Sequence, residues 1–321
     1  MATPELRHML RDDDLNHEEQ KQVLELAIKF HKNRFYHQPF AGPQGIAVIF
    51  DKPSTRTRSS FSIGVAELGG YPLVIDKSGS QLGRGEPVAD TARVLDRMAY
   101  GVVWRTFGQD RVEEMAKYST HPVVNALTDE FHPTQMLADL LTIEEKKGTL
   151  KGLRFTYFGD ARNNMGNSLM VACAKMGLHF TACAPKELFP AQELVEKCKE
   201  LAAQSGGSVT LTESVEEGAR DADVLYTDIW VSMGEPDSVW AERIRLLTPY
   251  QVNAEKMALA KPDALFMHCL PSFHDLKTKI GKEIHDRYGL NEMEVTDEVF
   301  ESAQSRVFEE AENRMHTIKA V

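Results

Sequence analysis

Hydroxyl groups alternate with cations in residues 51–61, DKPSTRTRSSF. An apolar run, GIAVIF, precedes this segment and a periodic apolar run, SFSIGVAELGG, follows it, which predicts a turn from a strand into a helix. The N–H groups at a helix start bind anions, and a planar guanidinium fits phosphate. Ser54, Thr55 and Arg56 therefore predict a phosphate site, although a capped helix with solvated arginines gives the same pattern. The segment is not a Walker loop, because the spacing G-x-x-x-x-G-K-[ST] is absent.

A second predicted helix start, HPTQ, carries two polar side chains on one turn. His132 and Gln135 are three residues apart, so both side chains can reach one point. A histidine can donate to a carbonyl oxygen, and a glutamine can donate or accept. An incidental histidine at a helix cap is the alternative interpretation. Arg105 ends the apolar run GVVWR and adds a cation at a strand end, although alone it would be read as a surface arginine.

The second half of the chain offers polar groups after two further apolar runs. FGDARNNMG joins a predicted strand to a predicted helix but lacks the G-x-G-x-x-G fingerprint of a dinucleotide site. Asn163 and Asn164 are then either turn formers or donors to a ligand carboxylate. Asp228 and Ser232 frame another strand end, where a carboxylate suits an ammonium group on a ligand, although Asp at a helix cap is the ordinary explanation.

The segment HCLPSFHD, residues 268–275, contains three residue types that bind metals. His268, Cys269 and His274 could be metal ligands, but a single cluster without a second pair is a weak signal. Cys269 could also be a nucleophile if a basic partner lies beside it, or a packing residue. The sequence leaves these three interpretations open.

Strand and helix patterns alternate along the chain, which predicts an α/β fold of two doubly wound domains, each a parallel sheet flanked by helices, divided near residues 145–152. Ligands of such sheets bind at the carboxyl ends of the strands, where the polar segments above collect. The predicted strands are 45–50, 71–76, 101–105 and 122–127, then 153–160, 179–185, 208–212, 222–229 and 264–270. The predicted helices are 60–70, 87–99, 112–119, 132–148, 167–177, 193–207 and 300–321.

Composition limits the class of protein. The chain has 321 residues, 42% hydrophobic and 26% charged, which is typical of a soluble globular protein. A formal net charge of −11 argues against binding to nucleic acid or anionic membranes. The four cysteines form no C-x-x-C pair, and no signal peptide or membrane-spanning run is evident, so we expect a reducing, cytoplasmic location.

Six motifs, in order and at their separations, resemble the aspartate/ornithine carbamoyltransferase family nearly end to end. They are PSTRTR, WRTFGQ, HPTQMLADLLT, DIWVSMGE, HCLP and AENRMH. DIWVSMG and HCLP favour the ornithine members, because the aspartate members lack the SMG loop and have Leu at the position of Cys269. The resemblance implies transfer of the carbamoyl group of carbamoyl phosphate to the side-chain amine of L-ornithine, giving L-citrulline and phosphate.

The resemblance also implies residue roles. Phosphate would be held by Ser54, Thr55, Arg56 and Thr57, with Gln81 coming from a neighbouring subunit. The carbamoyl group would meet Arg105, the segment His132, Pro133, Thr134 and Gln135, and Arg314 of AENRMH, with Cys269 and Leu270 lining the reacting centre. Ornithine would be bound by Asn164, Asp228, Ser232 and Met233. The catalytic set would be Arg56, Arg105, His132, Gln135, Asp228, Cys269 and Arg314.

The family further implies a carbamoyl phosphate domain at 1–147 plus about 300–321, an ornithine domain at 148–299 that closes with the first over the substrates, and a homotrimer or a multiple of trimers. The chemistry requires no metal or organic cofactor, and substrate phosphate, Asp228 or Cys269 could take the amine proton. One alternative is a nicotinamide oxidoreductase, against which the missing glycine fingerprint speaks. Another is a non-catalytic sensor of phosphoanions, against which the intact motifs speak.

Overall fold

The computed structural model describes residues 6–232 and 235–321, and its backbone divides into two compact units. Unit 1 comprises Met1–Leu141 and Ala311–Val321, and unit 2 comprises Thr142–Glu310. Both boundaries fall inside helices, because α5 (Pro133–Lys147) and α13 (Val307–Ala320) each contribute residues to both units. Across the described residues, no helix combines the length and apolar character that a membrane span requires.

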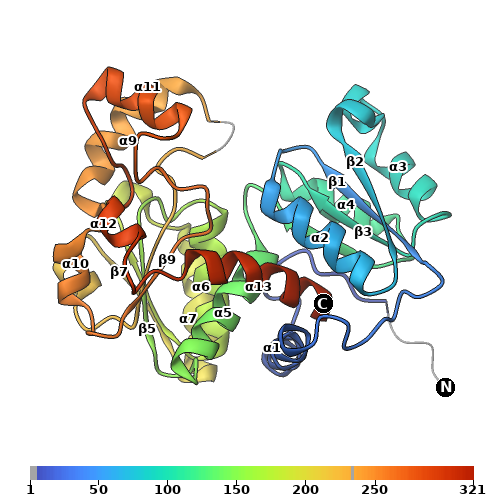
Figure 1. Cartoon of the computed structure of the whole chain (residues 1–321), viewed down its shortest axis with the longest axis horizontal. Helices are drawn as coiled ribbons and strands as arrows, with labels where there is room; N and C mark the ends of the chain where they lie inside the picture. The colour runs from blue at the N-terminus through green and yellow to red at the C-terminus, as the bar shows by residue number, and fades with distance from the viewer. Residues whose placement is uncertain (1–5, 233–234) are drawn as a thin grey trace. The chain divides into compact units, whose positions relative to one another are not determined.

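Unit 1 is built on a four-stranded parallel sheet in the order β2-β1-β3-β4 (Figure 1). A short turn of 3₁₀ helix follows β2 at Lys77–Gly79 and another lies at Leu82–Arg84. Its other elements are α1 (His17–Lys32), β1 (Gly45–Phe50), α2 (Thr55–Glu67), β2 (Tyr71–Asp76), α3 (Val88–Leu95), β3 (Gly101–Arg105), α4 (Gln109–Lys117) and β4 (Val123–Leu127).

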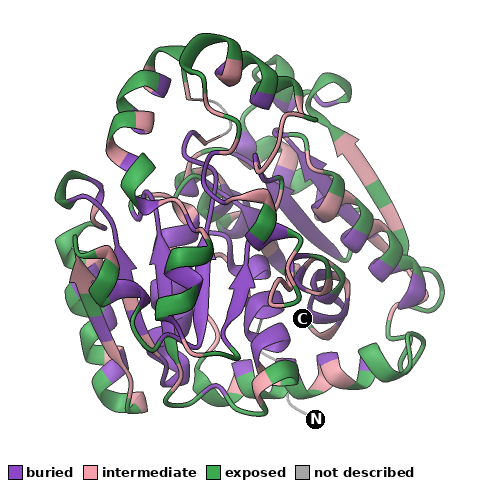
Figure 2. Ribbon diagram, turned by 60° about the vertical axis from the view of Figure 1, so that its left-hand side comes forward, coloured by how far each residue is buried: buried purple, intermediate pink, exposed green. Residues whose placement is uncertain are grey.

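Strand β1 shows why the sequence forms this layered core. Ala47 and Ile49 pack with residues of α3 and α4, whereas Val48 and Phe50 pack on the opposite face with α2 and with Ile318 of α13. Alternate side chains of a strand point to opposite faces, so a strand covered on both sides must be apolar at every position. GIAVIF meets this requirement, and the central strands are accordingly drawn as buried in Figure 2.

Unit 2 is built on a five-stranded parallel sheet in the order β7-β6-β5-β8-β9. Single turns of 3₁₀ helix lie at Lys186–Leu188, Asp237–Val239 and Thr248–Tyr250. The strands and helices are β5 (Arg154–Phe158), α6 (Asn164–Met176), β6 (His179–Cys183), α7 (Gln192–Ser205), β7 (Ser208–Thr212), α8 (Val215–Ala219), β8 (Val224–Thr227), α9 (Trp240–Leu247), α10 (Ala254–Leu259), β9 (Leu265–Met267), α11 (Lys279–Tyr288) and α12 (Asp297–Phe300).

The predicted fold class is confirmed, because each unit has a parallel sheet with helices around it and the last helix returns to unit 1. The predicted start of the last helix was wrong. Residues 300–306 do not continue it: α12 ends at Phe300, and α13 begins only at Val307. The isolated bridge between Phe266 and Ser305 explains the break, since residues 301–304 turn and Ser305 then pairs with β9.

Candidate active site

Each sheet reverses its winding at one point. Some candidate residues follow the strands on either side of that point, and others follow the neighbouring strands β4 and β9. In unit 1 the chain moves from β1 to β2 in one direction and from β3 to β4 in the other, so the switch point lies between β1 and β3. In unit 2 it lies between β5 and β8. Loops diverge outside the strand ends at a switch point, which leaves a crevice for ligands.

The STRTR segment forms the first turn of α2. Ser54 is the N-cap residue, and its Oγ accepts a hydrogen bond from Thr57 N at 3.1 Å. Thr55 is the first helical residue, and Arg56, half-buried, is the second. The capped helix and the anion site are therefore compatible, because the cap fixes the turn whose N-terminal dipole end attracts an anion.

A cavity of ≈ 770 Å³ opens beside this turn, lined by Ser54, Thr55, Arg58 and residues of the segment after β2. Gln81 lies in that same segment between the two 3₁₀ turns and is exposed. Arg58 contacts Asp76 and places its guanidinium 4.6 Å from the centre of the Phe50 ring. Arg58 is therefore held by contacts with β1 and β2.

Arg314 joins three helices of unit 1 at the base of the STRTR turn. It is 2% exposed, and its guanidinium donates to Gln135 Oε1 at 2.6 Å and to Thr57 Oγ1 at 3.0 Å. Gln135 Nε2 in turn donates to Asp139 Oδ1 at 2.8 Å, which fixes the orientation of the amide. The planar donors of arginine hold these partners in a defined geometry. Three predicted site residues from distant parts of the sequence are thus in direct contact.

His132 lies among cations and is buried. Its Nδ1 is 3.4 Å from the Oγ1 of Thr134, while Pro133 begins α5. Burial first, and then the positive charges of Arg314, Arg105 and Arg56, hold the pKa of His132 well below its usual value. The imidazole is therefore neutral at pH 7 and can donate one hydrogen bond to a carbonyl oxygen without adding another cation.

Arg105 ends β3 at an irregularity in the sheet. The register between β3 and β4 shifts between Trp104 and Arg105, and Arg105 is 4% exposed. A bulge re-aims the side chain that follows it. Next to it, Asp51 Oδ2 accepts from Trp104 Nε1 at 3.1 Å and from Thr106 Oγ1 at 2.6 Å, which ties the ends of β1 and β3 together.

In unit 2, Asp228 and Cys269 meet at the ends of β8 and β9. Cys269 Sγ lies 3.2 Å from Asp228 Oδ1, which also accepts from Ile229 N at 2.8 Å. Burial outweighs these hydrogen bonds and the nearby His268, and it raises the pKa of Asp228. The next residue, Leu270, has a φ of 56°, which is unusual for a residue with a side chain.

Glu294 was not predicted from the sequence, although it contacts residues on both sides of Cys269 and Leu270. His268 Nε2 lies 3.3 Å from Glu294 Oε1, and the same oxygen accepts from Ser272 Oγ at 2.8 Å and from Phe273 N at 2.6 Å. Burial would raise the pKa of Glu294, but His268 and the backbone donors outweigh it and lower it. No motif marks Glu294, because its partners lie more than twenty positions away in the chain.

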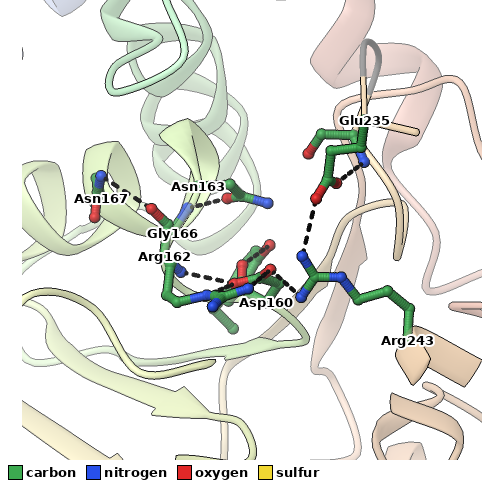
Figure 3. A network of polar contacts seen from close by, with 9 residues as sticks. Asp160, Arg162, Asn163, Gly166, Asn167, Glu235 and Arg243 are labelled. Atoms are coloured by element: carbon green, nitrogen blue, oxygen red, sulfur yellow. Dashed lines mark hydrogen bonds and ion pairs between the residues drawn. The ribbon is translucent and has the colours of Figure 1, made fainter. Parts of the chain in front are cut away.

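The described ornithine candidates follow the two strands at the switch point of unit 2: Asn164 follows β5, and Asp228 and Ser232 follow β8. Figure 3 shows Asn163 and Gly166 in the turn that leads from β5 into α6. Asn163 is the N-cap of α6, and its Oδ1 accepts from Gly166 N at 3.0 Å, so Asn163 is a turn former and Asn164 begins the helix. A Cβ on Gly166 would lie 2.4 Å from Ala161 O, so only glycine allows this close approach. Ser232 N donates to Glu235 Oε2 at 2.7 Å. Met233 lies outside the described residues.

Three groups in the described chain place possible metal ligands within 4.8 Å of one another: Asp228, His268 and Cys269; His274, Asp275 and Asp297; and His31, Glu312 and His316. The predicted trio of His268, Cys269 and His274 is not among them. His274 instead contacts Asp297 Oδ1 at 2.7 Å and stacks on the ring of Phe300.

Comparison with known proteins agrees with this geometry. The family model described as aspartate/ornithine carbamoyltransferase, carbamoyl-P binding domain, matches residues 7–145. The model described as the Asp/Orn binding domain of the same family matches residues 151–321.

Curated relatives are similar over nearly the whole chain. An ornithine carbamoyltransferase from Bifidobacterium longum subsp. infantis is 64% identical and covers 99% of this chain and 95% of its own. A catabolic ornithine carbamoyltransferase from Treponema denticola is 60% identical over 98% of this chain and 94% of its own.

Among solved structures, ornithine carbamoyltransferase from Pyrococcus furiosus superposes with a TM-score of 0.89 at 40% identity, covering 100% of this chain and 97% of its own. The anabolic enzyme from Campylobacter jejuni gives a TM-score of 0.86 at 34% identity, covering 98% and 97%. The resemblance read from six motifs is confirmed, and the chain belongs to the aspartate/ornithine carbamoyltransferase family.

Proposed function

We propose that this protein transfers the carbamoyl group of carbamoyl phosphate to the side-chain amine of L-ornithine, giving L-citrulline and phosphate. The contact of Arg314 with Thr57 and Gln135 carries the assignment most directly, because it assembles a cationic site from three predicted motifs. The high identity to relatives named ornithine carbamoyltransferase supports the choice of acceptor.

Unit 1 binds carbamoyl phosphate. The first turn of α2 provides backbone N–H groups, and Ser54, Thr55, Arg56 and Thr57 provide side-chain donors for the phosphate. Arg56 remains with the phosphate as it leaves and stabilises its growing charge. We assign this role to the first-half region 1–147 together with about 300–321.

Arg105, His132 and Gln135 act on the carbonyl oxygen of the same substrate, with Arg314 beside them. Negative charge develops on that oxygen when the amine attacks, and fixed donors stabilise it more strongly than the ground state. The depressed pKa of His132 keeps its ring neutral, so it serves as a hydrogen-bond donor without releasing a proton.

Region 148–299 binds ornithine through Asn164, Asp228, Ser232 and Met233. The attacking amine must be neutral, so the ammonium group has to lose a proton before it reacts. The raised pKa of Asp228 makes it a better proton acceptor than an ordinary carboxylate. Cys269, which contacts Asp228, and Leu270 border the reacting carbon.

A homotrimer, or a multiple of trimers, is the proposed assembly, in the cytoplasm. The edge strand β2 supports it, because Tyr71 is 59% exposed and Leu73 is 40% exposed. Apolar side chains on an unpaired sheet edge favour contact with another chain. Gln81 follows this edge strand, and contacts in a trimer join two different surfaces, so the Gln81 segment of one copy would lie against another face of the next copy.

The test is to incubate purified protein with carbamoyl phosphate and L-ornithine and to measure citrulline and phosphate. We expect both products in equal amounts. Product from L-aspartate or putrescine, with none from ornithine, would refute the acceptor assignment. Binding of NAD(H) in calorimetry, without citrulline formation, would favour the oxidoreductase alternative.

A further inference from the structure

Arg243 of α9 lies between two carboxylates in unit 2 (Figure 3). Its Nη1 donates to Asp160 Oδ2 at 2.7 Å, and its Nη2 donates to Glu235 Oε1 at 2.9 Å. The Arg243 side chain is 11% exposed and that of Asp160 is 9% exposed. One planar guanidinium therefore joins residues from two loops at a fixed separation.

Both carboxylates also hold the backbone of the loops that carry them. Asp160 Oδ1 accepts from Arg162 N at 3.1 Å, directly before the Asn163 cap of α6. Glu235 Oε2 accepts from Ser232 N at 2.7 Å. The series Ser232–Glu235–Arg243–Asp160 thus connects the loop after β8 with the loop after β5.

These two loops flank the switch point of the unit 2 sheet. The loop after β5 leads into Asn164, and the loop after β8 carries Ser232, which are two of the proposed ornithine ligands. The distance between Asn164 and Ser232 therefore depends on the contacts that Arg243 makes with Asp160 and Glu235.

Stability alone does not account for a partly buried cluster of this kind. The interaction between two buried charges roughly offsets the cost of removing them from water, and apolar replacements are often as stable. Arg162 adds a second cation, with its Nη2 at 2.9 Å from Asp160 Oδ2, so two carboxylates face two guanidinium groups. Because these positive and negative charges are equal in number, the network does not strongly attract or repel a zwitterionic substrate.

We propose that Arg243 is a positioning residue for the acceptor: it acts through Glu235 and Asp160 to set the distance between Ser232 and Asn164, and thereby the binding of the amino-acid end of ornithine. This inference rests on the proposed function. Because Arg243 acts through these two carboxylates, its loss should change the positions of Ser232 and Asn164 and leave their chemical groups unchanged.

The test compares Arg243→Met with Arg243→Lys in steady-state kinetics. A displacement of about 1 Å in a binding group can cost about 100-fold in rate, so Arg243→Met should raise the KM for ornithine about 10- to 100-fold. The KM for carbamoyl phosphate should stay at the wild-type value. The ammonium group of Arg243→Lys can contact one carboxylate but cannot bridge both as the guanidinium does. Its KM for ornithine should therefore lie between those of wild type and Arg243→Met.

Arg245→Met is the matched control on the same helix. Its side chain is 70% exposed and lies 4.0 Å from Glu187, away from the network. This variant should keep wild-type constants for both substrates. Glu235→Gln is the second probe, because it retains an acceptor for Ser232 N and removes the charge that faces Arg243. Its KM for ornithine should also rise. This variant tests the inference even if Arg243→Met does not fold.

The possible outcomes distinguish a failure of the proposed function from a failure of this inference. Wild-type protein that forms no citrulline would overturn the proposed function and this inference together. Active wild type with an unchanged KM for ornithine in folded Arg243→Met, or in Glu235→Gln, would overturn the inference alone. Equal losses toward both substrates, accompanied by a lower Tm, would show a general structural role and would also overturn it.

Discussion

The two units place their candidate residues at the same point of the same kind of sheet, yet the charges are opposite. In unit 1 the switch point is surrounded by Arg56, Arg105 and Arg314. In unit 2 it is bordered by the carboxylate of Asp228, with Glu294 buried beneath the adjoining segment. The architecture supplies the position of a ligand, and the side chains at the strand ends decide which ligand it is.

The electrostatic consequences differ in the same way. Cations and burial lower the pKa of His132 in unit 1, whereas burial raises the pKa of Asp228 in unit 2. In both places the neutral form of the side chain is favoured. The cations around His132 and its burial thus keep its ring uncharged, whereas burial makes Asp228 hold a proton more readily than an ordinary carboxylate does.

The largest expected effect comes from removing a cation in unit 1. Arg56→Ala should lower turnover by about 100- to 1,000-fold, because a fixed donor to the charge of the transition state is lost. Carbamoyl phosphate binding should weaken in calorimetry. Arg58→Ala is the comparison variant: Arg58 also lines the cavity but is held by Asp76 and Phe50, so its loss should weaken carbamoyl phosphate binding much less. Equal losses in the two variants would contradict the assignment.

In unit 2, Asp228→Asn should lower kcat/KM for ornithine by about 100-fold through loss of a positioned proton acceptor. The KM for carbamoyl phosphate should change much less, and equal changes would count against dividing the substrates between the units.

The same variant has a stability consequence with a defined sign. A raised carboxyl pKa means that the folded state loses stability as the pH rises through that pKa. Because asparagine carries no such charge, Asp228→Asn should unfold at a higher denaturant concentration than wild type at pH 7. The advantage should disappear below the ordinary aspartate pKa, and a variant less stable at pH 7 would contradict the account.

The smallest expected effect is the pH response of His132. Its folded pKa is lowered, so its contribution to stability is present above the ordinary histidine value and is lost as the pH falls below it. In an NMR titration, the His132 ring signal should show no protonation between pH 8 and pH 6 in folded protein, yet titrate near its ordinary value, about 6.5, in urea. A folded-state midpoint at that value would remove the contrast between the units.

Local pattern was sufficient for much of the fold. The strands 45–50, 71–76, 101–105 and 208–212 were predicted with the bounds that the structure has, because uninterrupted apolar or β-branched runs carry a strong signal. The helix predicted at 60–70 in fact begins at Thr55, since the polar STRTR residues form its first turn and hide its periodicity. Short helices such as α8 and α10 were not predicted, because one or two turns provide too few positions for a period to show.

The candidate site divides similarly. The rule that ligands bind at the carboxyl ends of parallel strands located STRTR, HPTQ and the residues around Asp228. Arg314, by contrast, was found only through the resemblance, because it lies 257 positions from Thr57 and no local pattern marks it. Glu294 and Arg243 were missed altogether, since a buried charge is recognised only by partners that the fold brings to it.

The place of Arg314 on the last helix has a consequence for synthesis on the ribosome. Ile318 completes the core of unit 1, and Arg314 completes the contacts of Gln135, but both are translated after all of unit 2. Unit 2 can fold as one continuous stretch while the earlier chain waits for its final helix. Contacts between residues far apart in the sequence form slowly. The nascent residues of unit 1 should therefore be the part of the chain that requires protection from aggregation.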